Sequence, residues 1–343
     1  MTSLMKTAGK RSATKMRRAV LANAICVLTG VAFCSYFKVL VPVPTTFARA
    51  RRVLGYENWL QYDYDNLAAQ RYWLREMSQG EINSADFARV MTLTSLFKHH
   101  ELNKKDEVIL VGGTNAGQLS DAILHNCPQV TFHGFEVQKE FYTQVRNRLS
   151  AYPNVHIHNL GWSDQAGTAR IGGEGGTAGL YDPNGQRGWK MQHETVTTTT
   201  LSNFTSEKSI EKVLYLVIDT EGHEPKVIRG MELEHAHNRE RFSLFQFELG
   251  GTWAEQDARH GGDAWTQYTT AAYLHNLGYD LFLIGFSEWL HVQPTFFMTE
   301  DNPSVLDEGF GPFVQGNLLA MYKTVHQGLR RSILRNTYFP KRD

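Results

Sequence analysis

Acidic residues are absent from the beginning of the chain, where no Asp or Glu precedes Glu57. Positive residues are frequent in the same stretch, and this composition is typical of targeting or membrane contact rather than of a folded core. Cysteine is scarce too: Cys26 and Cys34 lie in this stretch, so Cys127 stands alone and an intradomain disulfide is excluded. Lys+Arg and Asp+Glu are balanced at 35 each, so the composition gives no indication of a nucleic-acid partner.

Residues 19–37 (AVLANAICVLTGVAFCSYF) carry no charge. As a helix they would span about 28 Å, close to the hydrocarbon thickness of a bilayer. Six positive residues precede this stretch and only Lys38 follows it at once, which predicts a signal anchor with a cytoplasmic N-terminus and a lumenal main domain. The interpretation is a single-pass type II membrane protein of the Golgi or endoplasmic reticulum. A cleaved signal peptide, or a transit peptide to a mitochondrion or plastid, would also lack acids.

The rest of the chain divides by pattern. Residues 38–104 interleave charges with aromatic side chains and predict a helical stem, in which Ser84 is a candidate N-cap. Residues 105–325 form the main domain. Basic tails occupy residues 1–18 and 326–343.

From Asp106 onward, short apolar runs alternate with helical stretches. The expected strands are 107–111, 130–136, 155–160, 213–219, 242–249 and 279–285, and the expected helices are 118–126, 139–149 and about 268–277. Near-continuous apolar strands separated by helices predict a doubly wound, mostly parallel α/β sheet with helices on both faces. Ligands bind such sheets beyond the carboxyl ends of the strands, where the strand order reverses. The glycine-rich section 171–188 predicts a hairpin.

The first and second expected strands end in residues suited to a nucleoside. Gly113, Asn115 and Gly117 follow the first strand in a loop where glycine lets the backbone turn tightly and approach a ligand. The spacing is not G-x-G-x-x-G, so a nicotinamide cofactor is not favoured. Glu136 ends the second strand, where an acid can accept both ribose hydroxyls of an adenosine. Together they favour an adenosine-containing cofactor, although a plain strand–helix turn and an exposed strand-end acid have the same pattern.

The fourth expected strand runs into Asp219-Thr220-Glu221-Gly222-His223-Glu224, and Gly230 follows a short helical stretch. This segment resembles the signature of the FkbM family of S-adenosylmethionine-dependent methyltransferases, which reads near K-I-D-x-E-G-x-E. Further landmarks fall in the family's order over residues 105–325: Gly113, Asn115, Gly117 and Gln118; Phe135 and Glu136; Ser163, Asp164 and Gly167; Thr200 and Leu201; Phe247 and Glu248; Gly278 and Tyr279; and 317–320. Two positions depart from the pattern, because Val111 stands where the family has Asp and Val217 where it has Lys.

The resemblance implies a Rossmann-like methyltransferase domain that binds S-adenosylmethionine. By position, it implies that the cofactor is bound by Gly113, Asn115, Gly117, Glu136, Ser163, Asp164 and Asp219. In such folds the Asp that Val111 replaces commonly helps to hold the cofactor's amino-acid end. Because of that departure, a catalytically inactive relative of the family is an alternative interpretation of this protein.

Acids at the ends of the fourth and fifth strands are candidates for catalysis. Asp219, Glu221 and Glu248 should converge, and carboxylates there can complement a sulfonium and take a proton from an acceptor. Clustered acids raise one another's pKa, which suits a general base. We expect Asp219 to orient cofactor and acceptor, and His223 or Glu221 to act as the base, although the family has no His at position 223 and a plain helix-start residue is the alternative. No metal is assigned, since spacing does not distinguish a divalent-cation site from a hydrogen-bonded acid cluster.

These features predict an O-methyltransferase that acts on a glycan or another small-molecule hydroxyl acceptor. One alternative is a non-catalytic protein that binds S-adenosylmethionine or a glycan and serves a partner enzyme. The other is a lumenal glycosyltransferase, which would share the anchor and stem. Its Asp-x-Asp motif belongs at a strand end, however, and Asp63-Tyr64-Asp65 lies in the stem.

Overall fold

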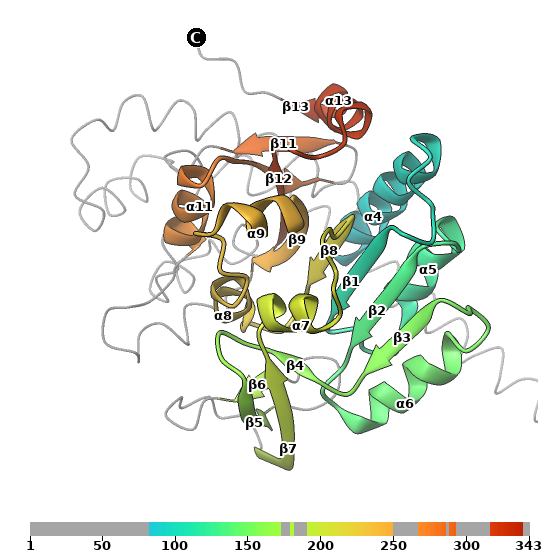
Figure 1. Cartoon of the computed structure of the whole chain (residues 1–343), viewed down its shortest axis with the longest axis vertical. Coiled ribbons are helices and arrows are strands. Elements are labelled where there is room, and N and C mark those ends of the chain that lie inside the picture. The colour runs from blue at the N-terminus through green and yellow to red at the C-terminus, as the bar shows by residue number, and fades with distance from the viewer. Residues whose placement is uncertain are drawn as a thin grey trace, which may run out of the picture. The chain divides into compact units, whose positions relative to one another are not determined.

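The computed structural model describes residues 82–172, 179–181, 191–249, 267–285, 288–292 and 316–338 (Figure 1). All of them belong to the larger of two compact units, Leu60–Asp343. The predicted anchor, 19–37, lies outside the described residues, as do the basic N-terminal tail and most of the predicted stem. Among the helices that are described, none combines the length and apolar character needed to cross a bilayer.

A nine-stranded sheet forms the centre of the domain. Its order is β13 (Thr337–Tyr338), β11 (Trp289–Val292), β10 (Tyr279–Ile284), β12 (Gly316–Tyr322), β9 (Leu244–Leu249), β8 (Tyr215–Ile218), β1 (Val108–Gly112), β2 (Thr131–Phe135) and β3 (Val155–His158). The five strands from β3 to β9 are parallel, whereas β12 runs antiparallel to both β9 and β10. The order reverses between β1 and β8, so the carboxyl ends of these two strands frame the expected ligand site.

Helices cover both faces of this sheet, as predicted. They are α4 (Ile82–His99), α5 (Gln118–Asn126), α6 (Lys139–Arg148), α7 (Leu201–Glu207), α8 (Glu224–Arg229), α9 (Ala236–Arg241), α11 (Gln267–Asn276) and α13 (Gln327–Arg335). Successive side chains of a strand point to opposite faces, and β1 accordingly sends Ile109 and Val111 into one apolar cluster and Leu110 into the other. The first cluster includes side chains of α4, α5 and α13, and the second includes side chains of α7, α8 and α11.

Helix α4 belongs to the core of this domain although it lies in the segment predicted as a stem. Its residues Val90, Leu93 and Phe97 are buried in the cluster that also holds Ile109 and Val111. The apolar spacing of three and four residues places these side chains on one helical face. The end of the predicted stem is therefore packed on the sheet.

A second sheet of four strands follows β3 in the chain (Figure 1). Its order is β4 (Gly161–Trp162), β7 (Met191–Thr199), β5 (Gly167–Gly172) and β6 (Gly179–Tyr181). Ile171, Leu180 and Val196 form its own small apolar cluster, against which Val137 packs. Since Val137 directly follows the Glu136 strand end, this sheet reaches the ligand-binding edge of the larger one.

Candidate functional site

The loop after β1 passes unusually close to the end of β8. Asp219 N donates to Gly112 O at 3.1 Å, and Gly113 has φ +76°. A Cβ added at Gly113 would lie 1.7 Å from the carbonyl oxygen of Asp219. A side chain is therefore excluded at this position, both by the left-handed backbone and by the neighbouring strand end. The glycine that the sequence placed at a cofactor loop is needed where the two central strands meet.

Glu136 ties the end of β2 to the same loop. Its Oε2 accepts a hydrogen bond from Asn115 N at 2.8 Å, and its Oε1 accepts one from Gln138 N at 2.9 Å. The side chain is buried, and burial raises the pKa of the carboxyl, against the lowering effect of the backbone N–H groups of Gln138 and Asn115. Glu136 is thus held in a fixed orientation at the strand end where the sequence predicts ribose binding.

A cavity opens at this edge of the sheet, with about 650 Å³ of space that includes open solvent. It is lined by Gly112, Gly113, Asn115, Phe135, Glu136, Val137, Gln138, Leu160, Gly161, Trp162, Leu180, Asp219, Thr220 and Glu221. Apolar walls with a few polar groups are typical of small-molecule sites. Three of the lining residues are acids and none is Lys, Arg or His, so the described walls favour a ligand that carries positive charge.

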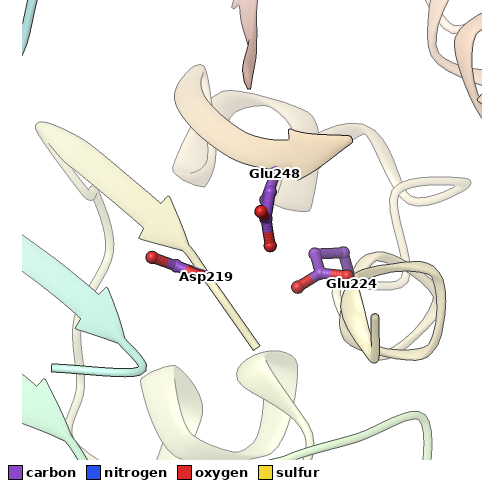
Figure 2. A group of neighbouring side chains, drawn as sticks. All are labelled: Asp219, Glu224 and Glu248. Carbon is purple, nitrogen blue, oxygen red and sulfur yellow. The ribbon is translucent and has the colours of Figure 1, made fainter. Parts of the chain in front are cut away.

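Asp219, Glu224 and Glu248 converge beside this cavity, from the end of β8, the start of α8 and the end of β9 (Figure 2). One carboxylate oxygen of each lies within 4.8 Å of the others. Glu224 is fully buried, and its Oε1 accepts hydrogen bonds from Thr220 N at 2.7 Å and Thr220 Oγ1 at 3.0 Å. Such an arrangement offers acceptor oxygens either to hydroxyl groups or to a divalent cation.

The convergence of acids was predicted with Glu221 as its third member, and the structure puts Glu224 there instead. Glu221 and Gly222 are both left-handed, with φ 55° and 94°, so the chain turns sharply after Thr220. Glu221 consequently lines the cavity, while Glu224, at the first position of α8, meets Asp219 and Glu248. Glu224 carries part of the family resemblance, but nothing in its spacing alone marks it as a neighbour of Asp219.

His223, Ser163 and Asp164 lie together, but none of them lines the cavity. His223 Nε2 is 3.1 Å from Ser163 Oγ, and Ser163 Oγ donates to Asp164 Oδ1 at 3.1 Å. Asp164 in turn is 3.7 Å from Arg229 Nη2 at the end of α8. These three predicted site residues therefore connect the loop after β4 to α8, next to the cavity.

Gly117 stands behind the loop rather than in the cavity wall. It has φ +86° at the N-cap of α5, and a Cβ there would lie 2.8 Å from Val145 Cγ2. Val111 and Val217, the two departures from the family pattern, are both buried in the apolar core and neither lines the cavity.

Nine lining residues were not among the predicted site residues: Gly112, Phe135, Val137, Gln138, Leu160, Gly161, Trp162, Leu180 and Thr220. Val137 and Gln138 directly follow Glu136, so their position past a strand end could have singled them out. Trp162 lies after the third expected strand, and its ring packs so closely on β1 that a Cβ at Gly112 would come within 2.3 Å of it. Leu180 reaches the cavity from the second sheet, and no local pattern predicts that contact.

The model of the methyltransferase FkbM domain matches residues 113–281. No curated protein matches the chain.

Three solved structures illustrate the likeness in fold. The methyltransferase domain of bacterial-CtHen1-C is 12% identical, with 69% of this chain and 99% of that chain covered and a TM-score of 0.35. A putative sarcosine dimethylglycine methyltransferase from Galdieria sulphuraria is 8% identical over 60% of this chain and 68% of its own, with a TM-score of 0.35. A SAM-dependent methyltransferase from Aquifex aeolicus is 11% identical over 54% of this chain and 79% of its own, with a TM-score of 0.27.

The geometry fits the cofactor that the family uses. Gly113 lets the loop after β1 approach the end of β8, Glu136 offers a fixed carboxylate, and the acids of the cavity complement a sulfonium cation. Residues 113–281 are therefore a methyltransferase domain of the FkbM family, and its cofactor is S-adenosylmethionine.

Proposed function

We propose that the protein is an O-methyltransferase whose acceptor is a glycan or another small molecule that carries hydroxyl groups. The supporting observation is the group of carboxylates at the ends of β8 and β9, beside the cofactor cavity. Carboxylate oxygens accept hydrogen bonds from hydroxyl groups. The described part of the cavity wall has no cationic side chain, which disfavours an acceptor bound through a phosphate or carboxylate group.

Each acid has a separate part in this proposal. When bound, S-adenosylmethionine supplies an electrophilic methyl group. Asp219, at the switch point of the sheet, orients cofactor and acceptor. Glu221 lines the cavity and takes the proton of the acceptor hydroxyl. At the same time the oxygen of that hydroxyl forms a bond to the methyl carbon, and the electron pair of the broken carbon–sulfur bond stays on sulfur. Glu248 holds a neighbouring hydroxyl group, and the fully buried Glu224 fixes Thr220 in the cavity wall through two hydrogen bonds.

The assignment of Glu221 in preference to His223 follows from their surroundings. Glu221 faces the cavity, whereas His223 is 6% exposed and its Nε2 is engaged with Ser163. A base must reach the proton that it removes, directly or through one water.

The test is methyl transfer by the full-length protein from isotopically labelled S-adenosylmethionine to a panel of glycans and simple polyols. We expect an alkali-stable methyl ether as the product. Glu221→Gln should lower transfer by about 100-fold or more, because a positioned base typically contributes that much, while the calorimetric Kd for the cofactor changes little. Transfer to amines or carboxylates with no ether formed would refute O-methylation. Cofactor binding without transfer to any acceptor would favour the non-catalytic alternative.

We propose further that residues 19–37 anchor the protein with its methyltransferase domain in the lumen of the secretory pathway. The support is the apolar stretch and the excess of positive residues before it. In intact microsomes, a C-terminal tag should resist protease until detergent is added, and deletion of residues 1–37 should abolish that protection. A tag that is digested without detergent would contradict a lumenal domain, and protection inside mitochondria or plastids would favour the transit-peptide alternative.

A further inference from the structure

His223 stands at the N-cap of α8 without capping the helix through its side chain. Its ring turns instead toward the loop after β4, where Nε2 lies 3.1 Å from Ser163 Oγ. The side chain is buried, with 6% of its surface exposed. A buried imidazole that leaves its own helix end to bond a different loop is positioned by that contact.

The direction of the hydrogen bonds assigns the proton on His223. Ser163 Oγ has one proton, which it donates to Asp164 Oδ1. Ser163 can then only accept from His223, so Nε2 carries the proton. A protonated Nε2 does not remove a proton from an acceptor, and this nitrogen is therefore a donor that holds the loop.

The other end of α8 contacts the same two residues. Gly230, which follows the helix, packs so tightly that an added Cβ would lie 2.1 Å from Ser163 O. Arg229 Nη2 lies 3.7 Å from Asp164 Oδ2. Both ends of the short helix are thus clamped to Ser163 and Asp164.

The clamp joins two walls of the cofactor cavity. Gly161 and Trp162 line it immediately before Ser163, and Asp219, Thr220 and Glu221 line it shortly before His223. We propose that His223 is a positioning residue, which sets the distance between these walls through Ser163 and so determines how tightly the cofactor is bound. The proposal rests on the cofactor site alone and is independent of the acceptor.

The test is calorimetric binding of S-adenosylmethionine and of its demethylated product, S-adenosylhomocysteine, to the full-length protein. His223→Phe keeps a ring and removes the donor, and Ser163→Ala removes the acceptor oxygen. We expect each variant to raise the Kd of both ligands by about fivefold to tenfold, because the loss of one buried hydrogen bond has an effect of this size. The double variant should bind no more weakly than the weaker-binding single variant, because both changes remove the hydrogen bond between His223 and Ser163.

Rescue and controls separate this role from the alternatives. His223→Gln places an amide N–H near the same point and should bind both ligands within about twofold of the wild type. His237→Gln, at an exposed position of α9, is the matched control and should have no effect. Ser163→Ala removes a single oxygen and stays informative if His223→Phe does not fold. Wild-type affinity in both single variants, losses that multiply in the double variant, or a loss confined to S-adenosylmethionine would each overturn the proposal.

Discussion

Two histidines on neighbouring strands should make the protein sensitive to acid. His133 on β2 is buried, its Nδ1 lies 3.0 Å from Nε2 of His158 on β3, and Phe204 of α7 packs edge-on against both rings. Burial lowers the pKa of His133 to about 3, and His158, His156 and Lys208 act in the same direction. Burial also lowers the pKa of His158 to about 4, with further lowering by Lys208 and His156. Both rings are therefore neutral in the folded protein at physiological pH.

The sign of the effect follows from which state takes up protons first. In the unfolded chain a histidine titrates near pH 6.5, so the unfolded state gains protons as the pH falls while the native state does not. Above about pH 6.5 the two histidines therefore cause no loss of stability through protonation. The free energy of unfolding decreases as the pH falls from about 6.5 to the folded-state pKa values of about 4 and about 3. At about pH 5, 1.5 units below the unfolded pKa, each ring would contribute a loss of up to about 2 kcal/mol. We expect about 1–2 kcal/mol per ring, since His158 is only partly buried.

Urea denaturation at about pH 7.5 and about pH 5 measures this loss. His133→Gln keeps hydrogen-bonding groups beside His158 but has no titratable proton, so its stability should fall by about 1–2 kcal/mol less than that of the wild type between the two pH values. His237→Gln, an exposed substitution, should retain the wild-type pH dependence. If the wild type and His133→Gln lose the same stability on acidification, the reasoning from the buried pair is wrong.

Three other substitutions probe the cofactor edge of the sheet. Gly113→Ala forces a Cβ to within 1.7 Å of Asp219 O at a left-handed position. It should lower the free energy of unfolding by at least about 2 kcal/mol in thermal denaturation and abolish cofactor binding. The control Gly167→Ala, with nothing within 4 Å of its Cβ, should change stability and cofactor affinity little. Glu136→Gln removes the negative charge of the carboxylate that accepts a hydrogen bond from Asn115 N. It should raise the calorimetric Kd of S-adenosylmethionine by about tenfold or more. Glu248→Gln should leave the cofactor Kd almost unchanged, because Glu248 does not line the cavity, and should lower labelled methyl transfer; equal losses in both would place it in cofactor binding instead.

The parallel half of the fold could be predicted from local pattern. Each apolar run between Val108 and Ile218 became a strand within a few residues of the expected bounds, and the helix expected at 118–126 has those bounds in the structure. Strands β1, β2 and β8 are buried on both faces, so their apolar composition alone identifies them. Strand order is different in kind. The insertion of β12 between β9 and β10, antiparallel to both, depends on pairing with residues far away in the sequence.

The second sheet also depends on pairing between distant segments, which local sequence pattern does not predict. The section 171–188 was expected to form a hairpin, and it contributes β6 and the end of β5 to a sheet that also contains β4 and β7. The pairing of Gly161 with Thr198 joins a two-residue strand to one far along the chain, and no periodicity announces a strand that short. Leu180 enters the cavity wall only because this sheet exists.

The location of a candidate site residue could be predicted where its place at a strand end was enough, but not where a turn decides the direction of its side chain. Glu136, Asp219 and Glu248 follow or end strands of a parallel sheet, so their convergence on one edge comes from topology. Glu221, His223 and Glu224 follow a turn with two successive left-handed residues, and this turn sends their side chains to the cavity, to Ser163 and to the acid cluster respectively. Backbone handedness at a non-glycine residue is not readable from spacing.

Val111 shows how the chain can lose a family carboxylate without losing the charge of the site. The side chain of Val111 is 1% exposed and packs with Ile109 in the cluster that includes α4 and α5, so an Asp at this position would need a partner in an apolar environment. Its neighbour Gly112 is hydrogen-bonded to Asp219, which lines the cavity from the adjacent strand. With Glu136 and Glu221 also in the wall, three carboxylates still face a cationic ligand. The replacement therefore favours packing of the core, while the electrostatic preference for a sulfonium is carried by the strands on either side of β1 and by the turn after β8.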